Sequence, residues 1–376
     1  METRSSPETP PLDADRAGSV RLGVAEARAI GERALCRIGY PLDEARLIAD
    51  QLVDNALCGY RFAGLPRILA IAADEKTAKP RKPIAILRES ALSALLDGGN
   101  NVGYVAAYRG AEIAIDKAKK SGIALVGVFN SYLSGRNAYY VEKIARAGLV
   151  AIHIASAKPR VVPPGGRRPA LGTNPFAVGF PSEDGPVIYD IGTSALMWGE
   201  VMLLAQLGEA LPEGSALDAE GRPTRDAAAA LQGGVLPFAG HKGYGLSFTV
   251  QALGLLAGAA LARGEVQDYG FLFIAIDPGL LLPAGAFPKQ MKELVERIKA
   301  TPREAAAAEI RIPSERAFRE RERRRREGLV LELKVLEAIE ALGRAAPKDT
   351  APPEPTSDTA VAVLVPVAVT LITPVT

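Results

Sequence analysis

Cysteine and histidine are scarce in this sequence of 376 residues, which contains two of each. Cys36 and Cys58 cannot build a disulfide framework or a multi-thiolate metal site, so we interpret them as buried structural thiols in a reducing compartment, the cytoplasm. His153 and His241 are too few for a histidine-rich metal centre, and neither H-E-x-x-H nor a paired C-x-x-C occurs. We therefore predict no metal site.

An excess of charge of either sign is also missing, because 45 lysines and arginines stand against 43 acidic residues and leave a net charge of +2. This balance gives no electrostatic footprint for nucleic acid or for an anionic membrane surface. The arginine-rich run at 319–327 is interspersed with glutamates, which is typical of a solvated helix face. We predict a small-molecule substrate, with neither nucleic acid nor a membrane as partner.

Long apolar runs are absent as well. The most apolar stretch, 246–261, is interrupted by Ser247, Thr249 and Gln251 and falls short of the roughly 18 apolar residues that a membrane span needs, so we interpret it as a core helix. Residues 1–19 lack the order of a secretory signal and are predicted to form a disordered leader. The Pro- and Thr-rich residues 346–376 are predicted to form a disordered tail.

The remaining chain, 48% apolar overall, predicts an α/β protein with a sizeable core. Helical periodicity indicates a helical part at about 20–82, an α/β part follows at about 83–312, and C-terminal helices follow at about 313–345. Strands are predicted at 84–95, 123–129, 149–154, 176–180, 187–191 and 271–276. Helices are predicted at 104–119, 138–147, 288–299 and 315–342.

The usual nucleotide motifs, G-x-G-x-x-G after a strand and G-x-x-x-x-G-K-[ST], are missing, so a nucleotide would have to be held differently. The best alternative is GHKGYG at 240–245, which leads into the apolar helix. Its glycines allow close backbone approach, the helix start offers unpaired N–H groups, and Lys242 adds a charge, which together suit a pyrophosphate. An ordinary glycine-rich connection explains the same residues equally well. His241 is the better functional candidate, whereas His153 lies in an apolar run typical of a core.

Two further polar clusters flank predicted strands. Thr173 and Asn174 follow the segment PPGG at 163–166 and could orient a carboxylate or an amide, although a simple turn is the alternative. Asp190 closes a strand and is followed by Gly192, Thr193 and Ser194. A turn or a helix cap is the alternative reading of Asp190.

In chain order, five segments resemble the malate/L-lactate dehydrogenase family: LGTNP (171–175), DIGTS (190–194), LPEGSALDAEGRPTRD (211–226), LPFAGHKGYGL (236–246) and IRIP (310–313). The resemblance extends over about residues 20–345. This family also includes ureidoglycolate, diketogulonate, sulfolactate and piperideine-2-carboxylate oxidoreductases. The resemblance implies a non-Rossmann α/β fold, with a helical lobe beside a mixed α/β lobe, usually in a homodimer whose site lies at a domain and subunit boundary.

The resemblance also implies a nicotinamide cofactor, NAD or NADP, used as NADH or NADPH. Thr173 and Asn174 would lie near the nicotinamide and the substrate. The positions expected to contact the cofactor are Val187, Ile188, Tyr189, Asp190, Ile191, Gly192, His241, Lys242, Pro313, Ser314 and Glu315.

Two departures concern the residues that transfer protons in the family. A Ser-His-Gly element there corresponds here to Phe62-Ala63-Gly64, while Gly59 and Arg67 still match. A second histidine, in an Asn-Ser-x-His-x-Gly element, corresponds to Leu133 in the segment NSYLSG at 130–135. Neither alanine nor leucine can donate a proton.

Replacement donors adjoin these positions, namely Tyr60, Tyr132 and Lys158. Arg61 and Arg67 could bind a substrate carboxylate, with Asn130 beside them. Tyrosine and lysine have unperturbed pKa values near 10, so acid catalysis at neutral pH would require tuning by the environment. A protonated iminium avoids that demand, because it accepts hydride without a new proton on its nitrogen.

Three hypotheses follow. The first is an NAD(P)-dependent reductase of a small 2-oxo or cyclic 2-imino carboxylate, with Arg67 holding the carboxylate and Tyr132 or Lys158 as acid. The second is a catalytically silent homologue that retains nucleotide binding. The third is a dehydrogenase of a bulkier apolar substrate, since Phe62, Ala63 and Leu133 would leave its pocket less polar.

Overall fold

The computed structural model describes residues 18–262, 265–266, 269–304 and 308–344, so the predicted leader and tail lie almost wholly outside the described residues. Its first lobe is helical because apolar residues recur every three or four positions. Helices α1 (Val24–Ile38) and α2 (Leu42–Leu57) pack together, and Gly39, with a φ of 113°, ends α1 in the left-handed conformation that glycine favours. The turn η1 (Arg61–Ala63) and α3 (Arg67–Ala73) follow.

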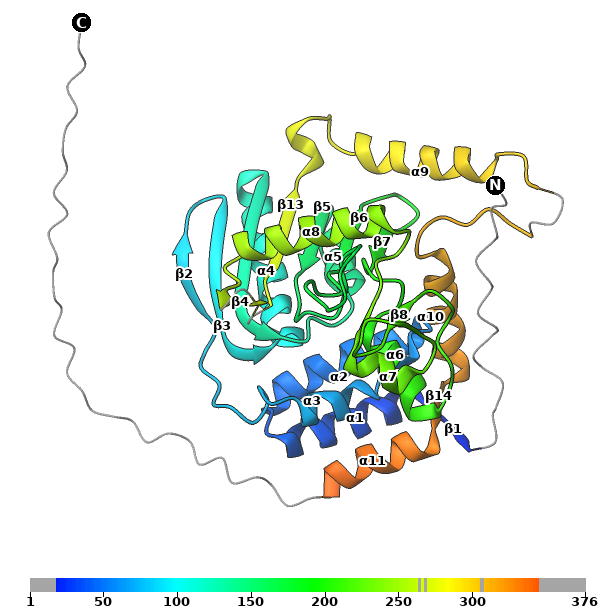
Figure 1. Ribbon diagram of the computed structural model, residues 1–376. Helices are drawn as coiled ribbons and strands as arrows, with labels where there is room; N and C mark the ends of the chain where they lie inside the picture. The colour runs from blue at the N-terminus through cyan, green and yellow to red at the C-terminus, as the bar shows by residue number, and fades with distance from the viewer. Residues whose placement is uncertain (1–17, 263–264, 267–268, 305–307, 345–376) are drawn as a thin grey trace, which may run out of the picture.

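The C-terminal part returns to this helical lobe, as Figure 1 shows for α10 (Glu315–Glu327) and α11 (Leu333–Arg344). Between them, β14 (Leu329–Glu332) pairs antiparallel with β1 (Ser19–Leu22). The prediction of one helix over 315–342 is therefore wrong. Gly328, with a φ of 90°, ends α10, and the next four residues gain a strand partner from the other end of the chain.

The second lobe is built on a seven-stranded mixed sheet with the order β2-β3-β4-β13-β5-β6-β7. Strands β3 and β4 are parallel and all other neighbours are antiparallel, so β5 also runs parallel to β3 and β4. The strands are β2 (Ala85–Glu89), β3 (Ser93–Val102), β4 (Ile123–Tyr132), β5 (Val150–Ala155), β6 (Phe176–Phe180), β7 (Val187–Ile191) and β13 (Phe271–Ile276).

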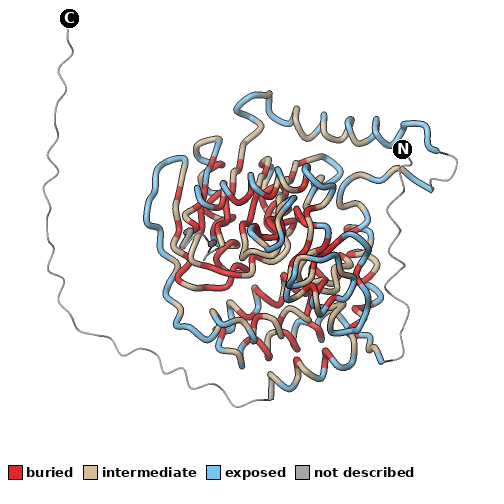
Figure 2. The backbone as a smooth tube through the Cα atoms, in the orientation of Figure 1, coloured by how far each residue is buried: buried red, intermediate tan, exposed pale blue. Residues whose placement is uncertain are grey.

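Helices cover both faces of this sheet. Phe271 and Phe273 of β13 face the core beneath α4 (Gly103–Ser121) and α5 (Asn137–Arg146), whereas Leu272 faces α8 (His241–Leu256). Figure 2 shows this buried centre in red. The prediction of a core helix at 246–261 holds for one face of α8 only, because on its outer face Phe248 is 61% exposed.

A small module follows β7. It contains α6 (Trp198–Leu207), β8 (Ala216–Leu217), β9 (Pro223–Thr224), α7 (Ala227–Gln232) and β10 (Gly234–Val235), with the strand order β10-β8-β9. Val161 and Leu171, from the connection between β5 and β6, complete its core. The other elements are β11 (Leu261–Ala262), β12 (Glu265–Val266), η2 (Pro278–Leu280) and α9 (Ala286–Lys299).

The cysteines differ in environment. Cys58 is buried as predicted, but Cys36 is exposed, because it lies on the outer side of α1. Among the described residues, every helix is too short or too polar to cross a lipid bilayer.

Candidate functional site

The end of β7 lies beside the start of α8. The N–H of Ala195 donates to the carbonyl of Leu236 at 2.7 Å, and the N–H of Phe238 donates to the carbonyl of Thr193 at 3.2 Å. The segments 190–194 and 240–245, both singled out from the sequence, are therefore neighbours in the structure.

The first turn of α8 is open to solvent. His241 and Lys242 are exposed, and no atom lies within 4 Å of the place where a Cβ would stand at Gly240 or Gly245. The N–H groups of Gly240 and His241 have no hydrogen-bond partner among the described residues. A helix start with available N–H groups and a lysine binds anions. These residues fit the pyrophosphate of a dinucleotide.

The two histidines differ as the sequence predicts. His153 is fully buried, its Nδ1 lies 3.0 Å from the carbonyl oxygen of Leu272, and its ring stacks on Phe273 at 3.9 Å. Burial lowers the pKa of His153 to about 3, against the hydrogen bond to Leu272, so it is a neutral core residue. His241 is the histidine that reaches solvent.

Along β7, the predicted cofactor residues have different surroundings. Ile188 is buried in the core, Tyr189 is 43% exposed, and Val187, Ile191 and Gly192 are half-buried. Asp190 caps α5, because its carboxylate accepts a hydrogen bond from the backbone N–H of Ala138. Among these side chains Tyr189 is the most exposed, and β7 is an edge strand of the described sheet.

The third predicted cofactor segment, Pro313 to Glu315, leads into α10. Ser314 has a φ of 62°, and Glu315 accepts hydrogen bonds from Lys299 at 2.5 Å and from Arg319. Among the described residues, none of its contacts joins it directly to His241 or Lys242.

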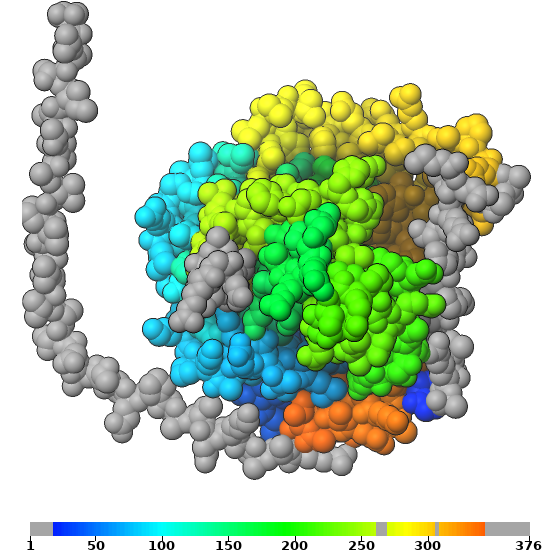
Figure 3. Space-filling model, in the orientation of Figure 1, coloured from blue at the N-terminus to red at the C-terminus, as the bar shows by residue number. Residues whose placement is uncertain are grey.

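A cleft with a volume of about 1150 Å³ opens near the carboxyl ends of β3, β4 and β5, which is where open α/β sheets usually bind ligands. One wall follows α3, a second is the connection between β5 and β6, and the third belongs to the small module. Figure 3 shows that connection, in green, on the front of the molecule between the blue helical residues and the brighter green module. The basic residues that line the cleft are Lys76, Lys79, Lys158, Arg160, Arg167 and Arg168.

Two of the predicted site residues, Asn130 and Lys158, meet in this cleft. Asn130 has a φ of 51° and donates a hydrogen bond of 2.7 Å to Asp97. The ammonium of Lys158 lies 3.2 Å from Glu75. Lys158 is the one predicted proton donor among the described residues that line the cleft.

Sequence reasoning missed the other basic residues of the cleft. Arg167 and Arg168 directly follow the glycine pair at 165–166, for which a simple turn is one of the two readings. Arg160 and Lys76 come from separate loops. The available signal was the gathering of cations around the segment PPGG at 163–166.

Arg67 lies at the start of α3, where its guanidinium and the ring of Phe62 pack on Gly199 of α6. Burial raises the pKa of the neighbouring Tyr104 phenol, and Arg67 opposes that rise. Arg160 lies over the ring of Trp198 at 4.4 Å, on the same helix as Gly199. The start of α6 thus covers two arginines, one of which lines the cleft.

Three more of the predicted residues, namely Tyr60, Arg61 and Tyr132, lie outside the cleft lining. Tyr132 is fully buried, and its hydroxyl pairs with Thr77 at 2.9 Å and with Tyr40 at 3.3 Å. Arg61 forms an ion pair with Glu332 of β14. The guanidinium groups of Arg136 and Arg316 lie over the ring of Tyr60, at 5.4 and 5.5 Å from its centroid. These positions favour structural roles for Tyr60, Arg61 and Tyr132.

Thr173 and Asn174 are buried and hold the β5–β6 connection to α8. The Asn174 carbonyl accepts the N–H of Ala157 at 3.1 Å, and its amide donates to Ser247 at 2.9 Å and to Gln251 at 3.0 Å. The main-chain carbonyl of Thr173 accepts the N–H of Thr193 at 2.9 Å. Asn174 therefore fixes the cleft wall relative to the open turn of α8.

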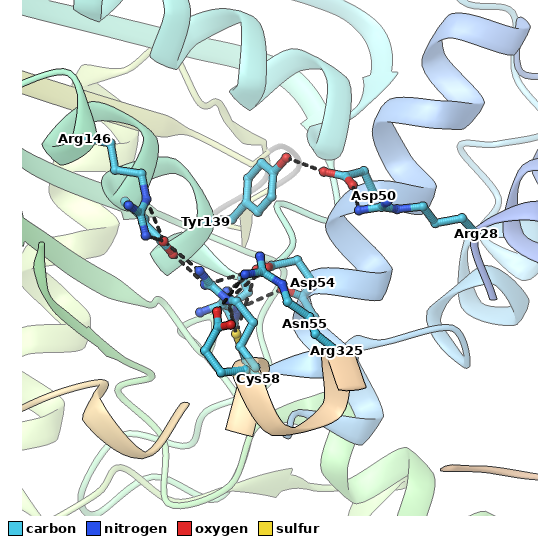
Figure 4. A network of polar contacts seen from close by, with 12 residues as sticks. Arg28, Asp50, Asp54, Asn55, Cys58, Tyr139, Arg146 and Arg325 are labelled. Carbon is cyan, nitrogen blue, oxygen red and sulfur yellow. Dashed lines mark hydrogen bonds and ion pairs between the residues drawn. The ribbon is translucent and has the colours of Figure 1, made fainter. Parts of the chain in front are cut away.

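A buried ionic network joins α2, α5 and α10 (Figure 4). Arg136 donates to Asn55 and to Asp54, both at 2.8 Å, and Arg321 binds Glu142 at 2.6 Å. Asn55 in turn donates to the carbonyl of Ala63 at 3.0 Å. The network thereby fixes the position of η1.

Known proteins resemble this chain in sequence and in fold. The family model described as malate/L-lactate dehydrogenase matches residues 22–340. An L-sulfolactate dehydrogenase of Methanothermobacter thermautotrophicus is 36% identical over 336 residues, which cover 86% of this chain and 97% of that protein. The chain belongs to the malate/L-lactate dehydrogenase family.

A further relative and a solved structure agree with this assignment to the malate/L-lactate dehydrogenase family. A Delta(1)-pyrroline-2-carboxylate reductase of Ancylobacter novellus is 33% identical over 339 residues, covering 86% of this chain and 98% of that protein. The crystal structure of a dehydrogenase from Sinorhizobium meliloti superposes with a TM-score of 0.79 at 28% identity, covering 86% of this chain and 98% of that one. The predicted α/β fold of this family, with its helical and mixed lobes, is confirmed.

The resemblance to the malate/L-lactate dehydrogenase family implies histidines at positions 63 and 133, where this chain has alanine and leucine. Ala63 is 8% exposed, and its carbonyl is the one held by Asn55. Leu133 is half-buried and has a φ of 54°, a conformation that leucine rarely adopts. The hydrogen bond from Asn55 holds Ala63, and Leu133 packs against the core of the helical lobe. Neither side chain can transfer a proton.

Proposed function

We propose that this chain is an NAD(P)-dependent oxidoreductase that transfers a hydride between a nicotinamide cofactor and a small 2-oxo or 2-hydroxy acid, or a cyclic 2-imino acid. The observation that carries the proposal is the open, lysine-bearing start of α8 beside the end of β7. Relatives named as a sulfolactate dehydrogenase and a pyrroline-2-carboxylate reductase support the same reaction class.

In this proposal, the N–H groups of Gly240 and His241 and the ammonium of Lys242 bind the cofactor's phosphates. The bound nicotinamide supplies or accepts the hydride. Tyr189 and the main chain of β7 border the same surface. Because NAD and NADP both carry this pyrophosphate, the test includes both cofactors.

Substrate binding is assigned to the cleft. Lys158 and Arg160 provide cations for the carboxylate next to the reacting carbon, with Asn130 beside them. A ketone also needs a proton, and Lys158 is the donor in the lining that we propose for it. A cyclic imine that enters as a protonated iminium needs none, which suits a chain with Ala63 and Leu133 at the histidine positions.

We also propose that the protein is a cytoplasmic homodimer. The outer face of α8 supports an association surface, because Phe248, Leu255 and Leu256 are 61%, 37% and 64% exposed on one helix. Sedimentation of the full chain at several concentrations tests this proposal. A single species with the monomer mass would contradict it.

Turnover tests the proposed function directly. The full chain is mixed with NADH or NADPH and, in separate reactions, with pyruvate, oxaloacetate and piperideine-2-carboxylate. We expect substrate-dependent loss of the reduced nicotinamide absorbance, fastest with the imine. Cofactor binding without turnover of any substrate would instead indicate a catalytically silent homologue.

A further inference from the structure

Gln251 is a buried glutamine in the second half of α8, and its side chain is 7% exposed. Its carbonyl oxygen accepts a hydrogen bond of 3.0 Å from the Asn174 amide, whereas its Nε2 has no hydrogen-bond partner among the described residues. A buried donor without a partner costs about 1–3 kcal/mol. A methionine of similar length would pack there without that cost, so stability alone does not explain the glutamine. What Gln251 supplies is an acceptor for Asn174.

The amide of Asn174 is held from two sides. Its Nδ2 donates to the main-chain carbonyl of Ser247 at 2.9 Å and to Gln251, and these two residues lie one turn apart on α8. Its Oδ1 accepts the N–H of Ala157 at 3.1 Å. The amide nitrogen of Asn174 is therefore bound to α8, and its oxygen is bound to the connection between β5 and β6.

This connection carries Lys158 and Arg160, the two cations assigned to the substrate. Ala157, directly before Lys158, is held by Asn174. On the other side, the N–H of Arg160 donates to the main-chain carbonyl of Leu171 at 2.7 Å. Lys158 thus extends into the cleft from between two fixed points, and the first of them depends on α8.

The start of α8 is the phosphate site of the proposed function. Gln251 lies ten residues beyond His241, at 251 against 241, which is about 15 Å along a helix axis. Figure 1 shows α8 as one unbroken helix lying across the sheet, and Val250 and Leu253 pack it there. Such a helix moves as one rigid element. Fixing its first turn therefore also fixes the two carbonyl oxygens that bind Asn174.

We propose that Gln251 is a positioning residue that couples the cofactor site at the start of α8 to Lys158 in the cleft, through Asn174. This inference rests on the proposed function, because it joins the two halves of that site. When the cofactor's phosphates fix α8, Asn174 holds Ala157, and the neighbouring lysine is in place for the substrate. Cofactor and substrate then bind cooperatively, and each raises the affinity of the other by the same factor.

Calorimetry measures this cooperativity without turnover. Piperidine-2-carboxylate and oxamate do not react with NADPH, because the first is a saturated amine and the second has an amide carbonyl that does not accept a hydride. Each acid is titrated into the full chain with and without saturating NADPH, and likewise with NADH. We expect the dissociation constant of at least one acid to fall by at least about fivefold with the coenzyme, the lower end of typical couplings between two sites.

Two buried glutamines provide matched variants. Gln251→Met removes the acceptor for Asn174, so the ratio of the two dissociation constants should fall toward one. Gln51→Met is the control, because Gln51 is 1% exposed and donates to the main-chain carbonyl of Tyr104 at 2.7 Å, a contact that does not involve α8. It loses a comparable buried hydrogen bond and should keep the wild-type ratio. Gln251→Glu retains an acceptor oxygen and should restore most of the cooperativity.

Hydrogen exchange of the wild type gives a measurement that does not depend on a folded variant. The coenzyme alone should slow exchange in peptides that contain Ala157, since its N–H is bound to Asn174. Unchanged exchange there, or cooperativity that is absent in the wild type or equal in Gln251→Met, overturns the inference, and the turnover assay then decides the proposed function separately. Cooperativity that depends on Gln251 without turnover of any substrate supports the coupling, and the proposed function fails alone. Failure of both acids to bind the wild type overturns the coupling together with the substrate assignment of the cleft.

Discussion

The carboxylate of Asp190, at the end of β7, accepts a hydrogen bond of 2.7 Å from the backbone N–H of Ala138 in the first turn of α5. Helix α5 has no side-chain cap of its own, so a residue from another element supplies it. We expect Asp190→Ala to lower the free energy of unfolding by about 0.5–2 kcal/mol, as the loss of a helix cap does. Urea unfolding at pH 7 measures this change.

Asp190→Asn is the matched control because it retains an oxygen acceptor without the charge. Burial raises the pKa of Asp190, against the opposing effects of the Ala138 N–H and Arg136. A raised carboxyl pKa contributes stability below the unfolded value of 3.8, and this contribution is lost as pH rises through the folded value. The stability of Asp190→Asn relative to wild type should therefore rise as pH increases from below 3.8. If the difference in unfolding free energy between Asp190→Asn and wild type stayed constant as pH rises from below 3.8, the raised pKa of Asp190 would be contradicted.

Arg136 and Arg146 offer a second matched pair, since both are arginines bound to acids around α5. The Arg136 side chain is 8% exposed and binds Asp54 and Asn55, whereas that of Arg146 is 58% exposed and binds Glu142. We expect Arg136→Ala to cost about 1–3 kcal/mol, because Asn55 would lose a buried hydrogen-bond donor while Arg321 still pairs with Asp54 at 3.1 Å. Arg146→Ala should cost no more than about 1 kcal/mol. A loss of no more than about 1 kcal/mol for Arg136→Ala in chemical unfolding would contradict this role of Arg136.

Local patterns were sufficient for much of the fold. Strands β6 and β7 begin and end where their apolar and β-branched residues predict, at 176–180 and 187–191. The strand β14 was missed because it is only four residues long and lies between two helical stretches, although Gly328 and the alternating Leu329 and Leu331 are strand signals. Only pairing with β1, more than 300 residues away, makes that segment a strand.

The same difference between local and long-range structure applies to the candidate site. The open start of α8 is a local motif, so its glycines and Lys242 could be found in the sequence. The cleft is assembled from loops after α3 and β5 and from the small module. The positive charge of the cleft arises because long-range packing brings Lys76, Arg160 and Arg168 together. These three residues do not occur in one short segment of the sequence.

His153 makes stability sensitive to acid. Burial lowers the pKa of His153 from 6.5 to about 3. Below pH 6.5 the unfolded state therefore binds a proton at this residue, whereas the native state stays unprotonated until the pH approaches 3. Stability from this group is complete above pH 6.5 and is lost as pH falls toward 3, by up to about 1.4 kcal/mol per pH unit. We expect His153→Phe to show a smaller loss of unfolding free energy between pH 6.5 and 4.5. Equal slopes for both proteins would show that His153 is not the cause.

Lys242 tests the proposed phosphate contact. Because its ammonium stands at the exposed start of α8, Lys242→Ala should weaken NADH or NADPH binding by about tenfold, the worth of one charged hydrogen bond. Affinity should also become less dependent on salt. Lys289→Ala, on the exposed side of α9, removes the same charge elsewhere and should leave affinity unchanged. A dissociation constant unaltered by Lys242→Ala would refute the contact.

Leu133 has a φ of 54°, in the left-handed region where histidine and asparagine are several-fold enriched and leucine is not. The backbone therefore accepts Leu133→His without added strain. If a histidine here is the missing proton donor, this variant should speed the reduction of 2-oxo acids by about 10²–10⁴-fold. Reduction of a protonated imine should gain much less, because that reaction needs no new proton on nitrogen.

Leu133→Asn tolerates the same φ but carries no comparable acid, so it separates relief of strain from acid catalysis. An equal gain with asparagine, or no gain with histidine in a variant that still binds the cofactor, would show that position 133 does not face the reacting carbonyl.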